Sequence, residues 1–456
     1  MVFSSLIFLI YFMPVFLFLY FAFAKYRNII LIVFSMIFYS FGEPIYVVLL
    51  IFSSSIDYII SRKLEENDDS FRRKIFLCIS ISINIFLLGF FKYSDFLMDT
   101  INYAFNTNLS LLNLPLPIGI SFYTFQTMSY TIDVYRRNVK ANKSYLNFLM
   151  YVSMFPQLIA GPIIRYIDIE KDLRNRMVSL ENLDLGAKRF IMGLSKKVIL
   201  ADSMNLMYID LIKANPSQLG FYLAYLAYGL HIYFDFSGYS DMAIGLGKMI
   251  GFDFLENFNY PYISRSISEV FRRWHISLGT WFREYVYIPL GGSKVIKWKI
   301  IRNLLFVWLI TGLWHGASIN FVLWGLYFGI LITLEKTIFK KMYVHVPTII
   351  KHLYVCIMMI FSWVIFANTD INTIIETYRY MFGLNNISLI SREMAFTIRN
   401  YSILLVISII SATPFVKKLF GKAPDTLKNC IYIILFLFCI FVISDSNYSP
   451  FIYFRF

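Results

Sequence analysis

Near the start of the chain, residues 3–24 read FSSLIFLIYFMPVFLFLYFAFA and contain no charged side chain. A membrane-spanning helix needs about 20 predominantly apolar residues, so this stretch is long enough to cross a bilayer. No basic segment precedes it, which favours a retained helix over a cleaved secretory signal. Lys25 and Arg27 follow directly. Because basic residues gather in cytoplasmic loops, we expect these two residues inside the cell and the N-terminus outside.

The same apolar character extends over all 456 residues, of which 58% are hydrophobic and only 15% are charged. Soluble domains are about half apolar and one quarter charged. The composition therefore excludes a disordered chain, a coiled coil and a soluble globular enzyme. The net charge of +14 comes from short basic clusters between apolar runs. Such clusters are typical of cytoplasmic loops, so we expect membrane lipids and no nucleic acid as partners.

Further apolar runs predict an all-α polytopic membrane protein with roughly 10–13 membrane segments. The basic loops at 61–74, 165–197 and 417–428 are expected in the cytoplasm, which leaves both termini outside. Residues 115–134 and 144–164 contain prolines, glycines and polar side chains. These two stretches are too polar to face lipid, so we expect broken or re-entrant segments that are buried in protein or line a cavity.

The sequence lacks the spacings of common metal and cofactor sites. Its four cysteines stand singly in apolar runs, so neither a disulfide framework nor a zinc site is expected. No His-Glu-x-x-His pair, Walker loop, Gly-x-Gly-x-x-Gly fingerprint or Gly-x-Ser-x-Gly elbow occurs. We therefore expect no metal and no bound cofactor.

His315 stands in the stretch GLWHGA at residues 312–317, between two apolar runs. An ionisable group at such a depth is costly unless it faces a cavity or a partner. A neutral imidazole can accept a proton near physiological pH, which suits a general base. The alternative is a core histidine that donates to a backbone carbonyl, and the spacing favours neither. Gly312 and Gly316 permit a close backbone approach or a break in the helix.

A second histidine, His275, lies in a basic and aromatic stretch that forms no clean membrane span. Read as a helix, this stretch places Phe271, Trp274, Leu278 and Trp281 on one side, and two arginines outside that stripe. The alternative is an interfacial amphipathic helix with snorkelling arginines. The other three histidines fit packing or surface roles: His231, His345 and His352.

Residues 271–292, FRRWHISLGTWFREYVYIPLGG, together with GLWHGA, resemble the membrane-bound O-acyltransferases. The similar branch holds the alginate and peptidoglycan O-acetyltransferases and the teichoic-acid D-alanyl transferase. Three other blocks also resemble this branch: PIGISFYTFQ at 117–126, FPQLIAGPI at 155–163 and YFDFSGYSDMA at 233–243. The number and order of these blocks carry the resemblance.

The resemblance implies three parts. They are N-terminal transmembrane helices at 1–110, a catalytic core with broken segments at 111–335, and C-terminal helices with an extracytoplasmic tail at 336–456. His315 would be the buried catalytic histidine and the general base, and His275 the second histidine, which orients the donor or stabilises the oxyanion. A central funnel, closed to lipid, would carry substrates. The substrate-funnel candidates are Arg272, Arg273, Trp274, Trp314 and Asn320.

The resemblance also implies a multi-pass enzyme of the plasma or inner membrane. It would take an acyl group from a cytoplasmic thioester and pass it outward to a cell-surface polysaccharide or peptidoglycan. The expected donor is acetyl-CoA, and the alternative is an acyl carrier protein thioester, as in D-alanyl transfer to teichoic acid. An extracytoplasmic SGNH-type acetyltransferase or esterase is the implied partner. The rival from another class is a glycan or lipid exporter in which His315 relays protons.

The tail FIYFRF at residues 451–456 is similar to the Phe-x-Tyr-x-x-Phe ending of polymer-acylating members. By this resemblance, Tyr453 would receive the acyl group and present it outside the cell. The alternative is an aromatic anchor at the membrane interface, a place where tyrosine is common.

Overall fold

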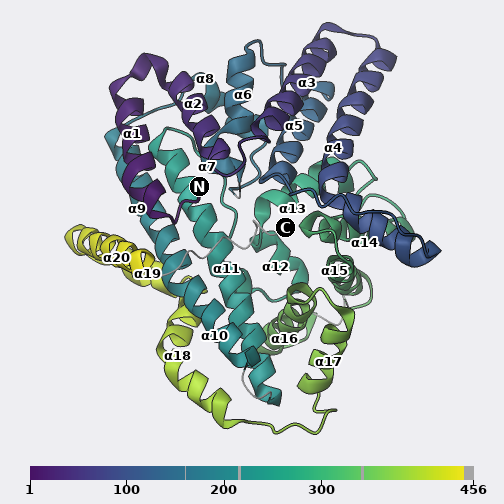
Figure 1. Ribbon diagram of the computed structural model, residues 1–456, viewed down its shortest axis with the longest axis vertical. Helices are drawn as coiled ribbons and strands as arrows, with labels where there is room; N and C mark the ends of the chain where they lie inside the picture. The colour runs from purple at the N-terminus through teal and green to yellow at the C-terminus, as the bar shows by residue number, and fades with distance from the viewer. Residues whose placement is uncertain (160, 214–216, 340–343, 446–456) are drawn as a thin grey trace. The chain divides into compact units, whose positions relative to one another are not determined.

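The computed structural model describes residues 1–159, 161–213, 217–339 and 344–445. Over these ranges the chain forms helices and connecting loops and no strand, which confirms the all-α prediction (Figure 1). The chain divides into two compact units. The first comprises Met1–Phe190 and Ser240–Glu256, and the second comprises Ile191–Tyr239 and Asn257–Phe456. These units differ from the three parts expected from the sequence, whose boundaries stay a prediction.

Five of the described helices are long and apolar enough to cross a membrane. They are α4 (Ser70–Phe105), α15 (Ile319–Thr337), α16 (Thr348–Ala367), α18 (Arg392–Ser411) and α20 (Asp425–Asp445). The segments Ile7–Ala22 and Ala24–Ser40 pass the same test together, but they meet at an angle of 108°. The multi-pass character is confirmed. The sequence predicted roughly 10–13 membrane segments, a number that included shorter and broken pieces. That number stays a prediction.

The first unit places a polar helix inside a group of apolar ones. Helices α3 (Val47–Glu66), α4 and α5 (Ile120–Tyr135) pack against one another (Figure 1). All of α5 from Ile120 to Val134 is buried. The carboxylate of Asp57 on α3 is fully buried, and it accepts hydrogen bonds from Ser80 Oγ at 2.5 Å and Asn84 Nδ2 at 2.8 Å. Side-chain partners of this kind let polar residues lie inside the unit, because buried polar groups need hydrogen bonds.

The remaining elements of the first unit are short. They are the π-helix η1 (Ile7–Phe12), the 3-10 helix η2 (Ala24–Tyr26), and the α-helices α1 (Met13–Ala22), α2 (Arg27–Ser40), α6 (Tyr145–Ser153), α7 (Phe155–Leu158) and α8 (Tyr166–Arg174). Helix α9 (Leu180–Ser195) begins in this unit and ends in the second.

Both segments that the sequence predicts to be broken contain a non-helical stretch, and most of their described residues are buried in protein. Helix α6 ends at Ser153, and α7 begins at Phe155 after a non-helical Met154. The chain before α5 is irregular up to Gly119, which has φ of 75°. A Cβ atom at Gly119 would lie 2.6 Å from the carbonyl oxygen of Leu158. The close approach and the positive φ together explain the glycine.

The second unit is built around α14 (Lys297–His315) and α15, which are joined by a short turn and lie side by side (Figure 1). A Cβ atom at Gly312 would collide with the carbonyl oxygen of Phe321 and would lie 3.1 Å from Gly325 Cα. Two glycines therefore let the backbones meet at the C-terminal end of α14. The close approach expected at Gly312 is confirmed.

The second unit also contains several shorter elements. They are η3 (Lys196–Ala201), α10 (Asp202–Lys213), η4 (Pro261–Ile263), α12 (Ile267–Arg273), α13 (Ile276–Phe282), η5 (Arg283–Tyr287), α17 (Ile371–Met381) and α19 (Phe415–Gly421). Helix α11 (Gln218–Met249) begins here and ends in the first unit.

A buried ion cluster also lies in the second unit. The Lys197 ammonium is 2.9 Å from the Asp235 carboxylate and 2.7 Å from that of Asp202. Lys197 and Asp235 are 3% and 0% exposed at their side chains, so these charges depend on one another. Nearby, the buried His231 has a hydrogen-bond partner, since its Nδ1 lies 3.0 Å from the carbonyl oxygen of Ala201, as expected of a packing histidine.

Candidate active site

A cavity of about 570 Å³ inside the second unit is lined by both candidate histidines. Its walls come from α12, α13, α14 and α15, and from η5. Apolar and aromatic side chains form most of the lining, including Phe271, Trp308 and Trp324. The fold therefore brings together two sequence blocks that are separated along the chain.

His275 lies at a break between two short helices. The continuous helix read over this stretch is wrong, because α12 ends at Arg273 and α13 begins at Ile276. The His275 backbone is left-handed, with φ of 45° and ψ of 55°. Asn257 accepts two hydrogen bonds that hold the break: Ile276 N donates to its carbonyl oxygen at 2.9 Å, and Ser277 N donates to its Oδ1 at 3.2 Å. Tertiary contacts thus override the local helical pattern.

The imidazole of His275 is 3% exposed and is held on several sides. Its ring centroid lies 4.7 Å from that of Phe236 and 5.7 Å from that of Trp314. Nδ1 is 3.1 Å from Asn257 Oδ1. Burial, and then the neighbouring His315, lower the pKa of His275 well below its usual value. The imidazole is therefore neutral at physiological pH.

His315 is the last residue of α14 and is also 3% exposed. Its ring lies at centroid distances of 5.1 Å from Trp314, 4.9 Å from Trp324 and 5.5 Å from Phe366. The helix ends here because Gly316 adopts an extended backbone. The Trp314 ring contacts the rings of both histidines. The two imidazoles are thus parts of one aromatic cluster that borders the cavity.

Comparison with known proteins assigns the chain to a family. A model of the MBOAT, membrane-bound O-acyltransferase family, matches residues 139–369, a range that includes both histidines and the whole cavity lining. The chain belongs to this family. It is 35% identical to the probable alginate O-acetylase AlgI of Pseudomonas putida over the full length of both chains. It is 33% identical to the peptidoglycan O-acetyltransferase of Helicobacter pylori, over 84% of this chain and 77% of that protein.

A more distant relative is the teichoic acid D-alanyltransferase of Bacillus subtilis. It is 31% identical over 47% of this chain and 58% of that protein. The resemblance read from the sequence blocks is confirmed, and the chain is an acyltransferase with a multi-pass membrane architecture.

The five substrate-funnel candidates of this acyltransferase fall into different environments. Arg272 and Trp274 line the cavity. Trp314 contacts both histidine rings. Arg273 pairs with Glu269 at 2.9 Å and is absent from the described cavity lining. Asn320 is also absent from that lining, and its Nδ2 donates to the carbonyl oxygens of Ile365 at 3.2 Å and Phe366 at 3.3 Å. A role in substrate transport stays a prediction for all five, and Tyr453 lies outside the described residues.

The structure adds residues that the sequence did not single out. Arg283 and Lys336 line the cavity together with Arg272, so three cationic side chains border it. Asn257 contacts His275 from outside the recognised blocks. A polar Lys336 at the end of an apolar run was the available signal for that residue, but Asn257 sits in a loop without a distinctive pattern.

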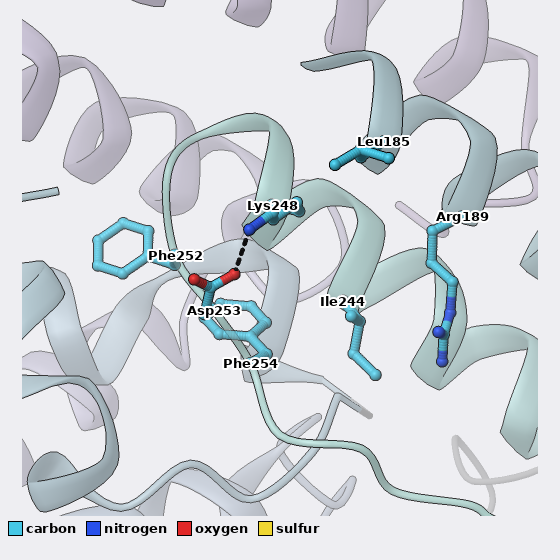
Figure 2. A pocket seen from close by; sticks show the side chains of 7 residues that line it. All are labelled: Leu185, Arg189, Ile244, Lys248, Phe252, Asp253 and Phe254. Atoms are coloured by element: carbon cyan, nitrogen blue, oxygen red, sulfur yellow. Dashed lines mark hydrogen bonds and ion pairs between the residues drawn. The ribbon is translucent and has the colours of Figure 1, made fainter. Parts of the chain in front are cut away.

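The described residues offer no alternative metal centre, since no group of three or more His, Cys, Asp and Glu side chains is placed to hold an ion. A smaller cavity of about 230 Å³ lies inside the first unit (Figure 2). Figure 2 shows that its Lys248 ammonium pairs with Asp253, at 2.7 Å. Its Arg189 guanidinium pairs with Asp241 at 2.5 Å and Glu256 at 2.6 Å. The cationic groups of this cavity are thus paired with carboxylates, and no imidazole lines it.

Proposed function

We propose that this acyltransferase takes an acetyl group from a cytoplasmic thioester and delivers it for O-acylation of a cell-surface polysaccharide or peptidoglycan. The observation that carries the proposal is the pair of buried histidines on one cavity. The names of the relatives, an alginate O-acetylase and a peptidoglycan O-acetyltransferase, support the acyl group and the class of acceptor.

The reaction requires a hydroxyl oxygen to attack the thioester carbonyl carbon. The new C–O bond forms as the C–S bond breaks, and the hydroxyl proton must leave. His315 is the proposed general base that takes this proton. General base catalysis contributes about 10²- to 10⁴-fold to such a step. Aromatic rings pack around the His315 imidazole, which is buried, so its contact with water is limited.

Acetyl-CoA is the proposed donor, and it is a substrate and not a bound cofactor. Arg272, Arg283 and Lys336 on the cavity lining suit the phosphate groups of CoA, because guanidinium and ammonium groups form strong charge-assisted hydrogen bonds with phosphate. An acyl carrier protein thioester also carries a phosphate on its prosthetic arm. D-alanyl transfer from such a carrier is therefore the second candidate, and the D-alanyltransferase relative favours keeping it.

We infer the direction of transfer from the charge pattern of the chain. In our proposal the enzyme lies in the plasma or inner membrane, the basic loops at 61–74, 165–197 and 417–428 face the cytoplasm, and both termini face outward. The tail residue Tyr453 then receives the acyl group as a phenyl ester. An extracytoplasmic SGNH-type partner passes the group to the glycan.

The activity is tested with purified protein in nanodiscs. The measurement is thioester consumption with labelled acetyl-CoA or with a D-alanyl carrier protein as the donor. We expect thioester consumption with acetyl-CoA, and its loss in His315→Ala and His275→Ala. His345→Ala is the matched control because His345 is exposed and lies outside the recognised sequence blocks. Consumption of the D-alanyl thioester alone would select the second candidate. An exporter would consume neither donor, and that result would refute the proposal.

Single-cysteine labelling from outside the cell tests the orientation. The four native cysteines, three of them exposed, are first replaced. We expect a cysteine in the 165–197 loop to stay unlabelled and a cysteine near the C-terminus to be labelled. The opposite pattern would invert the orientation and remove the basis for a relay at Tyr453.

A further inference from the structure

The side chain of Asn257 makes contacts that determine how the neighbouring histidine can act. Asn257 is fully buried. Its Oδ1 lies 3.1 Å from His275 Nδ1, 3.2 Å from Ser277 N and 2.9 Å from Ser277 Oγ. Three polar groups thus converge on a single atom.

The contact with the Ser277 backbone identifies that atom. A backbone N–H can only donate, so the side-chain atom of Asn257 that faces it must be the carbonyl oxygen and not the amide nitrogen. A carbonyl oxygen can only accept. His275 Nδ1 must therefore carry a proton and donate it to Asn257.

The Ser277 hydroxyl does not change this assignment. Its oxygen is 2.9 Å from Asn257 Oδ1 but 3.4 Å from His275 Nδ1, so its single proton belongs to the shorter bond. If Nδ1 were unprotonated, its lone pair would face the Asn257 oxygen at 3.1 Å without a proton between them. That arrangement is repulsive and would leave buried acceptors unsatisfied.

The other ring nitrogen, Nε2, is buried and has no hydrogen-bond partner among the described residues. In the neutral ring that donates from Nδ1, Nε2 bears a lone pair and accepts. His275 belongs to the lining of the cavity that also contains His315. The nitrogen that remains for a bound molecule is therefore an acceptor.

We propose that Asn257 is a positioning residue that holds His275 as the Nδ1–H tautomer, so that Nε2 accepts a hydrogen bond from an N–H or O–H group of the bound substrate. This inference rests on the proposed acyl transfer. It decides between the two roles left open for His275. A neutral imidazole with its proton on Nδ1 cannot donate from Nε2 to an oxyanion, so His275 orients the substrate.

The substitution Asn257→Asp tests the assignment with almost no change in shape. Ser277 N and Oγ would hold the new carboxylate, and its negative charge would favour the imidazolium form of His275. An adjacent opposite charge raises the pKa of such a group by about 1–3 units. A protonated Nε2 cannot accept, so the acidic limb of the pH–rate profile should move to higher pH by at least about one unit. The other charged or titratable groups on the cavity, Arg272, Arg283, Tyr287, His315 and Lys336, are unchanged.

Asn259→Asp is the matched control. It makes the same chemical change two residues away, at a side chain that is exposed. Its profile should follow that of the wild type. Coincident profiles for the two variants would overturn the proposal. The rate of Asn257→Asp should recover at alkaline pH, which a merely destabilised protein would not do.

A second measurement needs neither a variant of Asn257 nor any activity. Histidine labelled with ¹³C and ¹⁵N distinguishes the two neutral tautomers by magnetic resonance in the intact protein, with His275→Gln as the assignment reference. We expect the Nδ1–H form at His275, and the Nε2–H form would overturn the proposal. Because this readout is independent of turnover, it separates failure of the tautomer assignment from failure of the proposed function.

Discussion

Replacement of His315 by phenylalanine separates a catalytic role from a packing role. The His315 ring lies at centroid distances of 4.9 to 5.5 Å from the rings of Trp314, Trp324 and Phe366, so a packing histidine is a serious alternative. Phenylalanine supplies an apolar ring to the same cluster but cannot accept a proton. Loss of a general base should lower the rate about 10²- to 10⁴-fold, which corresponds to about 2.7–5.4 kcal/mol of activation free energy.

The assay is acetyl-CoA consumption by purified protein at saturating donor, together with the melting temperature of each variant. His315→Phe should retain a melting temperature near that of the wild type and lose the rate. His315→Gln should also lose the rate, since its amide cannot take the proton. His315→Ala should lose both, because truncation of a buried ring costs about 3–5 kcal/mol of stability.

The result that refutes this reasoning is an active phenylalanine variant. If His315→Phe keeps more than about a tenth of the wild-type rate, the loss is smaller than removal of a general base would cause. His315 would then be a packing residue, and the base would have to be sought elsewhere on the cavity.

Three further predictions concern other parts of the chain. Gly312→Ala should force α14 and α15 apart, cost about 1–3 kcal/mol of stability and lower the transfer rate, whereas Gly89→Ala, with open space around it, should have none of these effects. Lys197→Met should cost about 3–5 kcal/mol by leaving Asp235 buried without its ammonium, as measured by thermal unfolding, and the added change Asp235→Leu should restore part of that loss. Tyr453→Phe should abolish polymer acylation at normal protein level if the tail is a relay. Unchanged acylation in that variant would leave only an anchor role.

The architecture and the identity of the two histidines could be read from the sequence. Long uncharged runs have few folded alternatives to membrane helices, since a bilayer leaves no water to satisfy backbone groups. The prolines and glycines at 115–134 and 144–164 predicted interruptions, because their backbone restrictions act locally. His315 and His275 were found through the blocks around them. Spacing alone could not separate a base from a packing histidine.

Only the tertiary structure decided how the site is assembled. The break at His275 depends on hydrogen bonds that Ile276 and Ser277 donate to Asn257, which belongs to a different stretch of the chain. The helical pattern of residues 271–281 carries no information about such a partner. The grouping of Arg272, Arg283 and Lys336 on one cavity likewise follows from the packing of separate elements. Local sequence determines which segments are helical and apolar, but hydrogen-bond partners and charge clusters arise from contacts between distant segments, so they appear only when the chain is folded.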